Sequence, residues 1–284
     1  MKFFNIPEQA ASWCESERDR ARTIGLVPTM GALHEGHLSL VEQALAENDL
    51  CVVSIFVNPL QFNEASDYEA YPRDIDTDLN LLKQYGCSMT FTGSLSDFFD
   101  GAKNPGDIPL LDPGPFAQGL ESEHRPGHFA GVRTIVARLF QTVRPDRAYF
   151  GEKDYQQTLI ITDLAGQLGY PEVVVCPTLR EHDGLAMSSR NRRLKPAERA
   201  EAAGIYRALC AARTAWLSGQ RHPAILSARM HEVLKTTSLE VEYAEVRDPN
   251  NWNAVNGEAM TGTARALIAV RCGEVRLIDN LELA

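Results

Sequence analysis

Residues 28–38 read Pro28-Thr29-Met30-Gly31-Ala32-Leu33-His34-Glu35-Gly36-His37-Leu38, directly behind the apolar run Ile24-Gly25-Leu26-Val27. The apolar run predicts a buried strand, and the glycine-containing bend after it predicts the start of a helix. Such a bend leaves free backbone N–H groups that stabilise an anion. His34 and His37 lie at this point, and a protonated imidazole stabilises the charge that develops when a phosphoanhydride breaks. The stretch therefore predicts an anion site at the start of the helix.

The same histidine pair has two other interpretations. A histidine in a turn between strand and helix is commonly a solvated cap, and His-x-x-His on one helix face supplies half of a metal site. A metal site needs a third ligand. The candidates His124 and His128 lie far away in the sequence and have no metal spacing of their own. We therefore predict no metal-binding residues.

Length and composition limit the class of protein. With 284 residues, 44% of them apolar, the chain is long enough for two domains with a core in each. A formal net charge of −10 argues against binding nucleic acid or an anionic membrane, because such binding depends on lysine and arginine. Residues 1–22 lack the apolar core of a signal peptide, and the longest apolar run, Leu50–Val57, has only strand length. We expect a soluble protein.

The cysteines point to the compartment. The chain has 6 cysteines and no C-x-x-C pair, so neither a zinc knuckle nor a disulfide framework is indicated. This usage is typical of a reducing environment, and we expect a cytoplasmic protein.

The first two thirds of the chain alternate β-branched runs with helical patterns, which is typical of a parallel sheet covered on both faces. The predicted strands are Thr23–Val27, Leu50–Val57, Met89–Thr92, Arg147–Phe150 and Glu172–Cys176. The clearest helix is His128–Val143, which Pro145 ends. Residues 93–127 are rich in glycine, proline, aspartate and serine, and we interpret them as a long excursion with one short strand. The predicted fold is α/β, a Rossmann-like doubly wound parallel sheet.

The pattern changes after about residue 177. Two helices, Pro196–Leu217 and Pro223–Lys235, precede three strand-like runs at Val241–Val246, Arg265–Arg271 and Val275–Ile278. Short turns between neighbouring strands indicate an antiparallel sheet. We predict a domain over residues 1–178 and a smaller C-terminal α+β domain over residues 179–284, with a hinge at about residues 177–195.

Polar residues follow two more predicted strands. Asn58 and Gln61 follow the second strand, where neutral amides suit hydroxyls or a carboxylate that must stay nucleophilic. On this motif alone, an Asx-Pro turn with an exposed glutamine is the more frequent explanation. Lys153 and Gln157 follow the fourth strand and are four residues apart, which predicts one shared helix face. The carboxyl ends of parallel strands meet at one edge of the sheet, where ligands bind.

A fourth motif lies in the predicted hinge. The sequence Leu185-Ala186-Met187-Ser188-Ser189-Arg190-Asn191 places two hydroxyls beside a guanidinium, which is a compact anion-binding group. Alone, Ser-Ser-Arg is a frequent surface sequence. Because it follows three motifs at strand ends, we predict that this segment closes over a bound nucleotide.

Together, these four motifs resemble those of the pantoate–β-alanine ligase family. This family belongs to the nucleotidyltransferases that share a His-x-Gly-His signature with class I aminoacyl-tRNA synthetases. The resemblance extends from about Pro28 to Leu194 and includes Asp67-Tyr68, Tyr71-Pro72-Arg73 and Gly127-His128-Phe129. The synthetases carry Lys-Met-Ser-Lys-Ser where this chain has Ala186-Met187-Ser188-Ser189-Arg190, so Lys153 and Arg190 are expected to supply the positive charge.

The resemblance implies a role for each matching residue. Three residues are implied to be catalytic, namely His34, His37 and Lys153. Those implied to bind ATP are Met30, Gly31, Ala32, Leu33, His34, Glu35, Gly36, His37, Gly151, Glu152, Lys153, Asp154, Leu179, Met187, Ser188, Ser189 and Arg190. Gln61, Gln157 and Asn58 are implied to bind pantoate, and Gln61 later shares the site with β-alanine.

The implied activity is that of an AMP-forming acid–amino acid ligase in pantothenate and coenzyme A biosynthesis. The pantoate carboxylate attacks the α-phosphorus of ATP to give an enzyme-bound pantoyl adenylate, and the amine of β-alanine then displaces AMP. Mg²⁺ arrives with ATP, and the family resemblance suggests a homodimer. Two alternatives remain open: a single-step nucleotidyltransferase that transfers an adenylyl or cytidylyl group to a phosphorylated acceptor, and a catalytically silent nucleotide-binding module.

Overall fold

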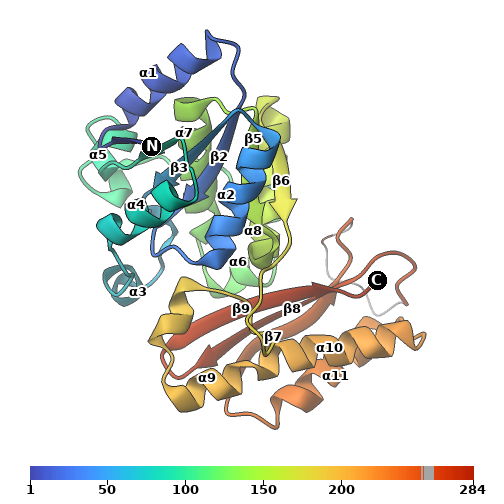
Figure 1. The fold of residues 1–284 in the computed structure, drawn as a ribbon. Helices are drawn as coiled ribbons and strands as arrows, with labels where there is room; N and C mark the ends of the chain where they lie inside the picture. Colours follow the sequence, from blue (N-terminus) through green and yellow to red (C-terminus); the bar gives the residue numbers. More distant parts are fainter. Residues whose placement is uncertain (251, 253–258) are drawn as a thin grey trace. The chain divides into compact units, whose positions relative to one another are not determined.

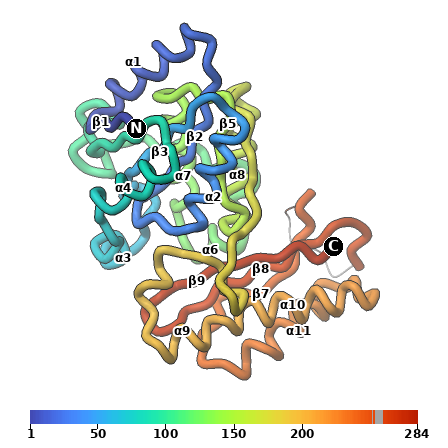
Figure 2. The backbone as a smooth tube through the Cα atoms, viewed as in Figure 1, coloured from blue at the N-terminus to red at the C-terminus, as the bar shows by residue number. Residues whose placement is uncertain are grey.

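A computed structural model of the chain describes residues 1–250, 252 and 259–284. The chain forms two compact units (Figures 1 and 2). The first comprises Met1–Ala117, Arg125–Glu152 and Gln156–Pro177, and the second comprises Gln118–His124, Lys153–Tyr155 and Thr178–Ala284. Within the described residues, no helix is both long and apolar enough to span a membrane.

The first unit is built on a parallel six-stranded sheet. Its strands are β1 (Lys2–Phe4), β2 (Ile24–Thr29), β3 (Leu50–Ile55), β4 (Met89–Phe91), β5 (Arg147–Gly151) and β6 (Glu172–Cys176), in the order β1-β4-β3-β2-β5-β6. The order runs in one direction from β2 to β4 and in the other from β5 to β6. The switch point of the topology, where open α/β sheets bind ligands, therefore lies between β2 and β5.

Helices cover both faces of this sheet (Figure 1). One face packs against α1 (Pro7–Arg18), α7 (His128–Val143) and α8 (Tyr155–Leu168), and the other against α2 (Glu35–Glu47) and α4 (Ile75–Gln84). Phe140 and Ile161 are fully buried on the first face, as Val53 and Leu82 are on the second. Strands buried on both faces read as continuous apolar runs, which is why the sequence shows no alternation there. The predicted doubly wound α/β fold is confirmed.

Several elements differ from the sequence prediction. Strand β1 and helix α1 were not predicted, because β1 has only three residues and the surface of α1 carries mixed charges. No strand lies within residues 93–127, all of which are described, so the predicted short strand is wrong. This excursion holds α5 (Leu95–Phe98), a 3₁₀ turn at Pro105–Asp107 and α6 (Glu121–His124). A 3₁₀ turn, η1 (Pro59–Gln61), and α3 (Ala65–Glu69) follow β3.

The second unit has an antiparallel three-stranded sheet. Strands β7 (Glu240–Arg247), β8 (Arg265–Cys272) and β9 (Val275–Glu282) pair in sequence order, and helices α9 (Pro196–Ala202), α10 (Gly204–Leu217) and α11 (Pro223–Leu234) accompany them. The single helix predicted at Pro196–Leu217 is divided at Ala203. A separate core forms between the sheet and the helices, so the predicted antiparallel α+β part is confirmed.

Part of the excursion belongs to this second unit. Glu121 is buried, where its carboxylate accepts hydrogen bonds from Tyr243 Oη at 2.7 Å and from two guanidinium nitrogens of Arg276 at 2.7 Å. Trp252 Nε1 donates to the carbonyl of Gln118 at 3.0 Å. The excursion is therefore long because it reaches the second sheet and contributes a buried, charge-assisted anchor there.

Candidate active site

The predicted site residues of the first unit follow the carboxyl ends of neighbouring strands. The histidine motif follows β2, and Asn58 and Gln61 follow β3, which pairs with β2 in register from Ile24 and Leu50 onward. Gln157 lies in α8, which begins after β5, the neighbour of β2 on its other side. The topology thus brings these motifs to the sheet edge at the switch point.

His34 and His37 lie at the start of α2. His34 is the N-cap residue, and its Nδ1 accepts a hydrogen bond from the backbone N–H of Gly36 at 3.2 Å. A ring nitrogen that accepts carries no proton, so the neutral imidazole holds its proton on Nε2. The rings of His34 and His37 are 4.1 Å apart between centroids. The two imidazoles therefore form one contiguous polar surface.

The backbone N–H groups of the preceding bend are hydrogen-bonded within the protein, whereas the sequence predicted that they would be free to bind an anion. Gly31 N donates to Thr29 Oγ1 at 3.2 Å, while Ala32 N and Leu33 N donate to the two carboxylate oxygens of Asp78 at 2.8 Å each. All three N–H groups are bonded inside the protein, two of them to a buried carboxylate from α4 that occupies the position predicted for an anion. The three N–H groups of this bend are therefore not open to an anion.

Asn58 is a buried support for Gln61. Asn58 is 1% exposed, and its Oδ1 accepts from Leu60 N at 3.2 Å. Its Nδ2 donates to Gln61 Oε1 at 3.0 Å and to the carbonyl of Gly131 at 3.3 Å. The Oε1 atom of Gln61 thus accepts within the protein. The amide of Gln61 consequently has its Nε2 hydrogens to offer to a ligand oxygen.

The backbone of Gln61 is fixed by His128, the first residue of α7, and by Arg125, which precedes that helix. Its carbonyl accepts from Arg125 Nη2 at 3.1 Å and contacts His128 Nδ1 at 2.9 Å. Arg125 Nη1 lies 3.1 Å from His128 Nε2. A guanidinium can only donate, so Nε2 accepts and the Nδ1–H of His128 donates to Gln61. This network determines the tautomer of His128 as well as the position of Gln61.

Gly131 allows α7 to lie against η1. A Cβ atom at this position would lie 2.1 Å from the carbonyl oxygen of Leu60 and 2.9 Å from Gln61 N. Real Cβ atoms do not approach backbone atoms so closely. Only glycine therefore permits the observed packing of α7 behind Gln61.

Lys153 is not on the helix face predicted for it. It lies in a 3₁₀ turn at Glu152–Asp154, before α8 begins, and it groups with the second unit, whereas Gln157 groups with the first. Its carbonyl accepts from Asn280 Nδ2 at 2.9 Å, and its Nζ lies 3.5 Å from Asp154 Oδ1. The backbone of Lys153 is therefore tied to β9, which accounts for the difference.

The segment that carries Leu179 and Met187 is tied to the same strand. Met187 N donates to the carbonyl of Leu179 at 3.0 Å, which closes a short hairpin. Arg180 forms a two-pronged ion pair with Asp279 of β9, at 2.5 and 3.0 Å. Burial raises the pKa of Asp279, and the Arg180 guanidinium opposes that shift. The hairpin and the Lys153 turn are therefore held by adjacent residues of one strand.

The Ser-Ser-Arg segment follows that hairpin. Ser188 Oγ caps the next 3₁₀ turn, Ser189–Arg193, by accepting from Arg190 N at 3.3 Å. Ser189 is buried, while Ser188 and Arg190 are partly exposed. Of this motif, the Arg190 guanidinium and the Ser188 hydroxyl are the groups best placed to meet a ligand.

The sequence did not predict three residues that support the site residues through hydrogen bonds: Asp78, Arg125 and His128. Asp78 lies in the acidic run Asp74-Ile75-Asp76-Thr77-Asp78, which has the composition of an exposed helix start. No local pattern distinguishes the one buried carboxylate in that run. For Arg125 and His128, the only signal was the family-like segment in which His128 lies.

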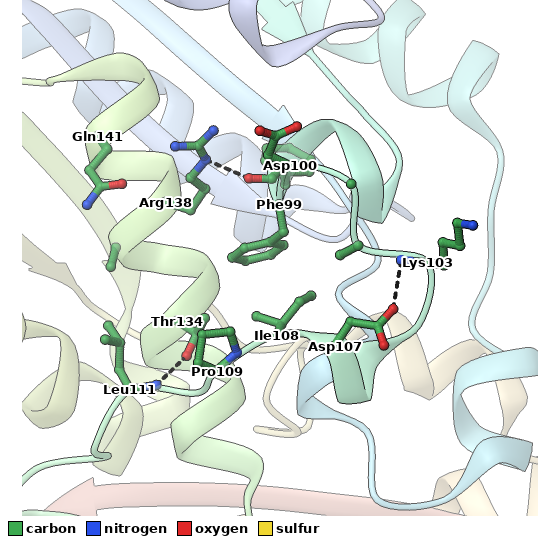
Figure 3. Close-up of a pocket in the computed structure, with 14 residues that line it drawn as sticks. Phe99, Asp100, Lys103, Asp107, Ile108, Pro109, Leu111, Thr134, Arg138 and Gln141 are labelled. Carbon is green, nitrogen blue, oxygen red and sulfur yellow. Dashed lines mark hydrogen bonds between the residues drawn. The ribbon is translucent and has the colours of Figure 1, made fainter.

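A cavity of about 640 Å³ lies elsewhere in the first unit, between α7 and residues 98–111 (Figure 3). Arg138 Nε donates across its wall to the carbonyl of Phe98 at 2.6 Å, and Leu111 N donates to Thr134 Oγ1 at 2.9 Å. None of its lining residues is a predicted site residue. In the part of the chain that the structure describes, no group of three or more His, Cys, Asp or Glu residues could hold a metal ion.

Comparison with known proteins yields concordant matches. A sequence model of the family described as pantoate-beta-alanine ligase matches residues 2–282. A pantothenate synthetase from Porphyromonas gingivalis is 44% identical over 99% of both chains. The crystal structure of pantothenate synthetase from Thermus thermophilus matches with a TM-score of 0.90 and 41% identity, covering 100% of this chain and 99% of that one. The pantoate-beta-alanine ligase of Francisella tularensis, complexed with β-γ ATP and β-alanine, matches with a TM-score of 0.80 and 32% identity over 100% and 98%.

Proposed function

The chain belongs to the pantoate–β-alanine ligase family, and we propose that the residues at its strand ends carry out the ligation through an enzyme-bound adenylate. The enzyme is an ATP-dependent ligase that condenses pantoate with β-alanine in pantothenate biosynthesis. The single observation that carries the assignment of the site is the convergence of the histidine motif and the Gln61 amide on adjacent carboxyl ends of β2 and β3.

The chemistry follows from a thermodynamic obstacle. A carboxylate and an amine do not form an amide in water without activation. A pantoate carboxylate oxygen attacks the α-phosphorus of ATP, the bond to the bridging oxygen breaks, and pyrophosphate leaves. The amine of β-alanine then attacks the acyl carbon of the pantoyl adenylate, loses a proton, and displaces AMP. Both steps depend on positioning and charge stabilisation more than on covalent help from the protein.

We assign the first-unit residues as follows. His34 and His37 contact the ATP phosphates and stabilise the charge that develops there. Gln61 and Gln157 bind pantoate. Asn58 orients the Gln61 amide so that it donates to pantoate. A neutral donor suits this task, because a full positive charge would hold the carboxylate and weaken it as a nucleophile.

The second unit carries the cationic ligands. We assign Lys153 to the reacting phosphate, Arg190 with Ser188 and Ser189 to the triphosphate, and Leu179 to the adenine. We assign the remaining matching residues of the four motifs to the lining of the nucleotide site. Mg²⁺ enters as the complex with ATP, whose phosphate oxygens are its preferred type of ligand.

The experiment is an assay with ATP, pantoate and β-alanine. AMP release that requires both pantoate and β-alanine supports the ligation. Exchange of pyrophosphate with ATP that depends on pantoate and occurs without β-alanine supports the adenylate. We expect His37→Ala and Lys153→Ala to lower turnover by about 100- to 1,000-fold, because each removes one stabilising group. Lys195→Ala, which changes an exposed lysine of the second unit, is the matched control. Normal rates in both site variants would refute the assignment.

We also propose a homodimer in the cytoplasm. The cysteine usage, without a C-x-x-C pair, supports the compartment. The family resemblance supports the dimer, and so does the exposure of two neighbouring leucines, Leu110 at 44% and Leu111 at 42%, on one segment of the first unit. Sedimentation equilibrium should give twice the chain mass of 31.5 kDa. Leu110→Glu should shift the mass toward that of one chain, and an unchanged mass would exclude this segment from the interface.

A further inference from the structure

Asp78 occupies an unusual position for a carboxylate. It is 2% exposed, yet it lies in the first turns of α4, a helix whose neighbouring acidic residues Asp74 and Asp76 face solvent. Each of its oxygens accepts one backbone N–H from the histidine-motif turn, at 2.8 Å from Ala32 N and 2.8 Å from Leu33 N. Its hydrogen bonds therefore join α4 to that turn.

The turn has the geometry of an anion-binding concavity. Gly31 and Ala32 both have left-handed backbone conformations, with φ of 81° and 51°. A Cβ on Gly31 would lie 2.9 Å from Asp78 Oδ2, so glycine is needed for the carboxylate to fit. Successive N–H groups in such turns commonly bind phosphates. Here the protein supplies its own anion.

The next residue after this turn is His34, whose ring caps α2. The turn therefore sets where the His34 ring and the adjoining His37 ring lie, at a centroid distance of 4.1 Å. We infer that Asp78 is a positioning residue for the adenylating step: it holds the Gly31–Leu33 turn in the shape that places the two imidazoles, and it does not touch substrate. This inference rests on the function proposed above.

The test is Asp78→Asn, compared with Asp76→Asn on the same helix. An asparagine keeps the shape but offers only one acceptor oxygen, and its NH₂ faces the second N–H. We expect Asp78→Asn to lower the rate of pantoate-dependent pyrophosphate exchange by about 100-fold, as for a catalytic group displaced by 1 Å. The KM for β-alanine, which enters later, should not change. Asp76→Asn removes the same charge from the surface and should stay within about twofold of wild type.

A spectroscopic measurement separates positioning from loss of folded protein. In ¹⁵N-histidine spectra, the ring signals of His34 and His37 should shift in Asp78→Asn while those of His231, in the second unit, stay in place. Thermal unfolding measures the folded fraction. The inference would be overturned if Asp78→Asn folds, shows unshifted histidine signals and exchanges pyrophosphate as fast as Asp76→Asn does.

A second variant covers the case in which Asp78→Asn does not fold. Thr29 Oγ1 accepts from Gly31 N and donates to the carbonyl of Ser54 at 2.8 Å. Thr29→Val removes these bonds from the turn, and Thr29→Ser retains them. We expect an exchange rate about 10-fold lower in Thr29→Val than in Thr29→Ser. Equal exchange rates in Thr29→Val and Thr29→Ser would overturn the role of the turn. Absence of turnover in the wild type would instead refute the proposed function, and the histidine spectra would then test whether Asp78 positions the two imidazoles.

Discussion

Replacement of Gly131 by alanine tests the packing of α7 against η1, the turn that carries Gln61. An added Cβ would lie 2.1 Å from the carbonyl oxygen of Leu60, about 1.3 Å short of ordinary contact. The obstructing atoms belong to the backbone and cannot rotate away. Overpacking of this kind costs about 3 kcal/mol, and the better helix propensity of alanine returns about 1 kcal/mol. We therefore expect the free energy of unfolding to fall by about 2 kcal/mol.

The same substitution should affect one substrate selectively. The helix and η1 must separate, and η1 carries Gln61, so the kcat/KM for pantoate should fall by about 100-fold. The affinity for ATP should not change, since the histidine motif follows a different strand. Urea unfolding followed by circular dichroism gives the stability, and initial rates at varied pantoate give the activity.

A matched control is available in α8. Gly166 is exposed and has no atom within 4 Å of a built Cβ, so Gly166→Ala should raise the free energy of unfolding by about 0.5–1 kcal/mol. The two glycine-to-alanine changes thus have opposite predicted signs. A Gly131→Ala protein as stable as the wild type, with unchanged kinetics for pantoate, would refute the reasoning.

Three further predictions concern individual contacts. Arg199 holds the pKa of Asp183 at about 2, below its ordinary value, so the pair stabilises the fold above about pH 4 and loses this effect as the pH falls toward 2. Asp183→Asn should therefore lower the free energy of unfolding by about 1–2 kcal/mol at pH 7 and by much less at pH 2, and equal losses in urea titrations at both pH values would contradict this. Tyr243→Phe should cost about 1–2 kcal/mol, because it removes a buried hydrogen bond to Glu121, and an unchanged Tm would show that the bond is dispensable. Gln61→Ala should raise the KM for pantoate by about 10-fold and leave that for ATP unchanged, so an equal rise in both would remove Gln61 from the pantoate site.

Periodicity was sufficient to predict the strands that hold the site. The predicted strand Leu50–Val57 corresponds to β3 at Leu50–Ile55, and the predicted helix His128–Val143 matches α7. These elements are buried, so their apolar pattern is strong. The short edge strand β1 buries little and has no comparable pattern, which is why it was missed.

Long-range hydrogen bonds were beyond the reach of sequence patterns. Asp78 and Ala32 are separated by 46 residues, and Glu121 and Arg276 by 155. In both cases a carboxylate with an ordinary local sequence becomes buried because a partner from another element satisfies it. The local sequence around a carboxylate does not predict that it will be buried, because burial depends on a hydrogen-bond partner from a distant part of the chain.

The direction of the hydrogen bonds around Gln61 also decides chemistry that residue identity leaves open. An amide can present either its oxygen or its NH₂ to a ligand. Asn58 Nδ2 donates to Gln61 Oε1, so the NH₂ of Gln61 is the group left to face a ligand oxygen. Arg125 can only donate to His128, which makes His128 the donor to the Gln61 carbonyl. The Arg125 guanidinium thus helps to fix the backbone of Gln61, whose side-chain amide is a neutral donor. In the mechanism proposed above, this donor orients the pantoate carboxylate and leaves it free to attack phosphorus.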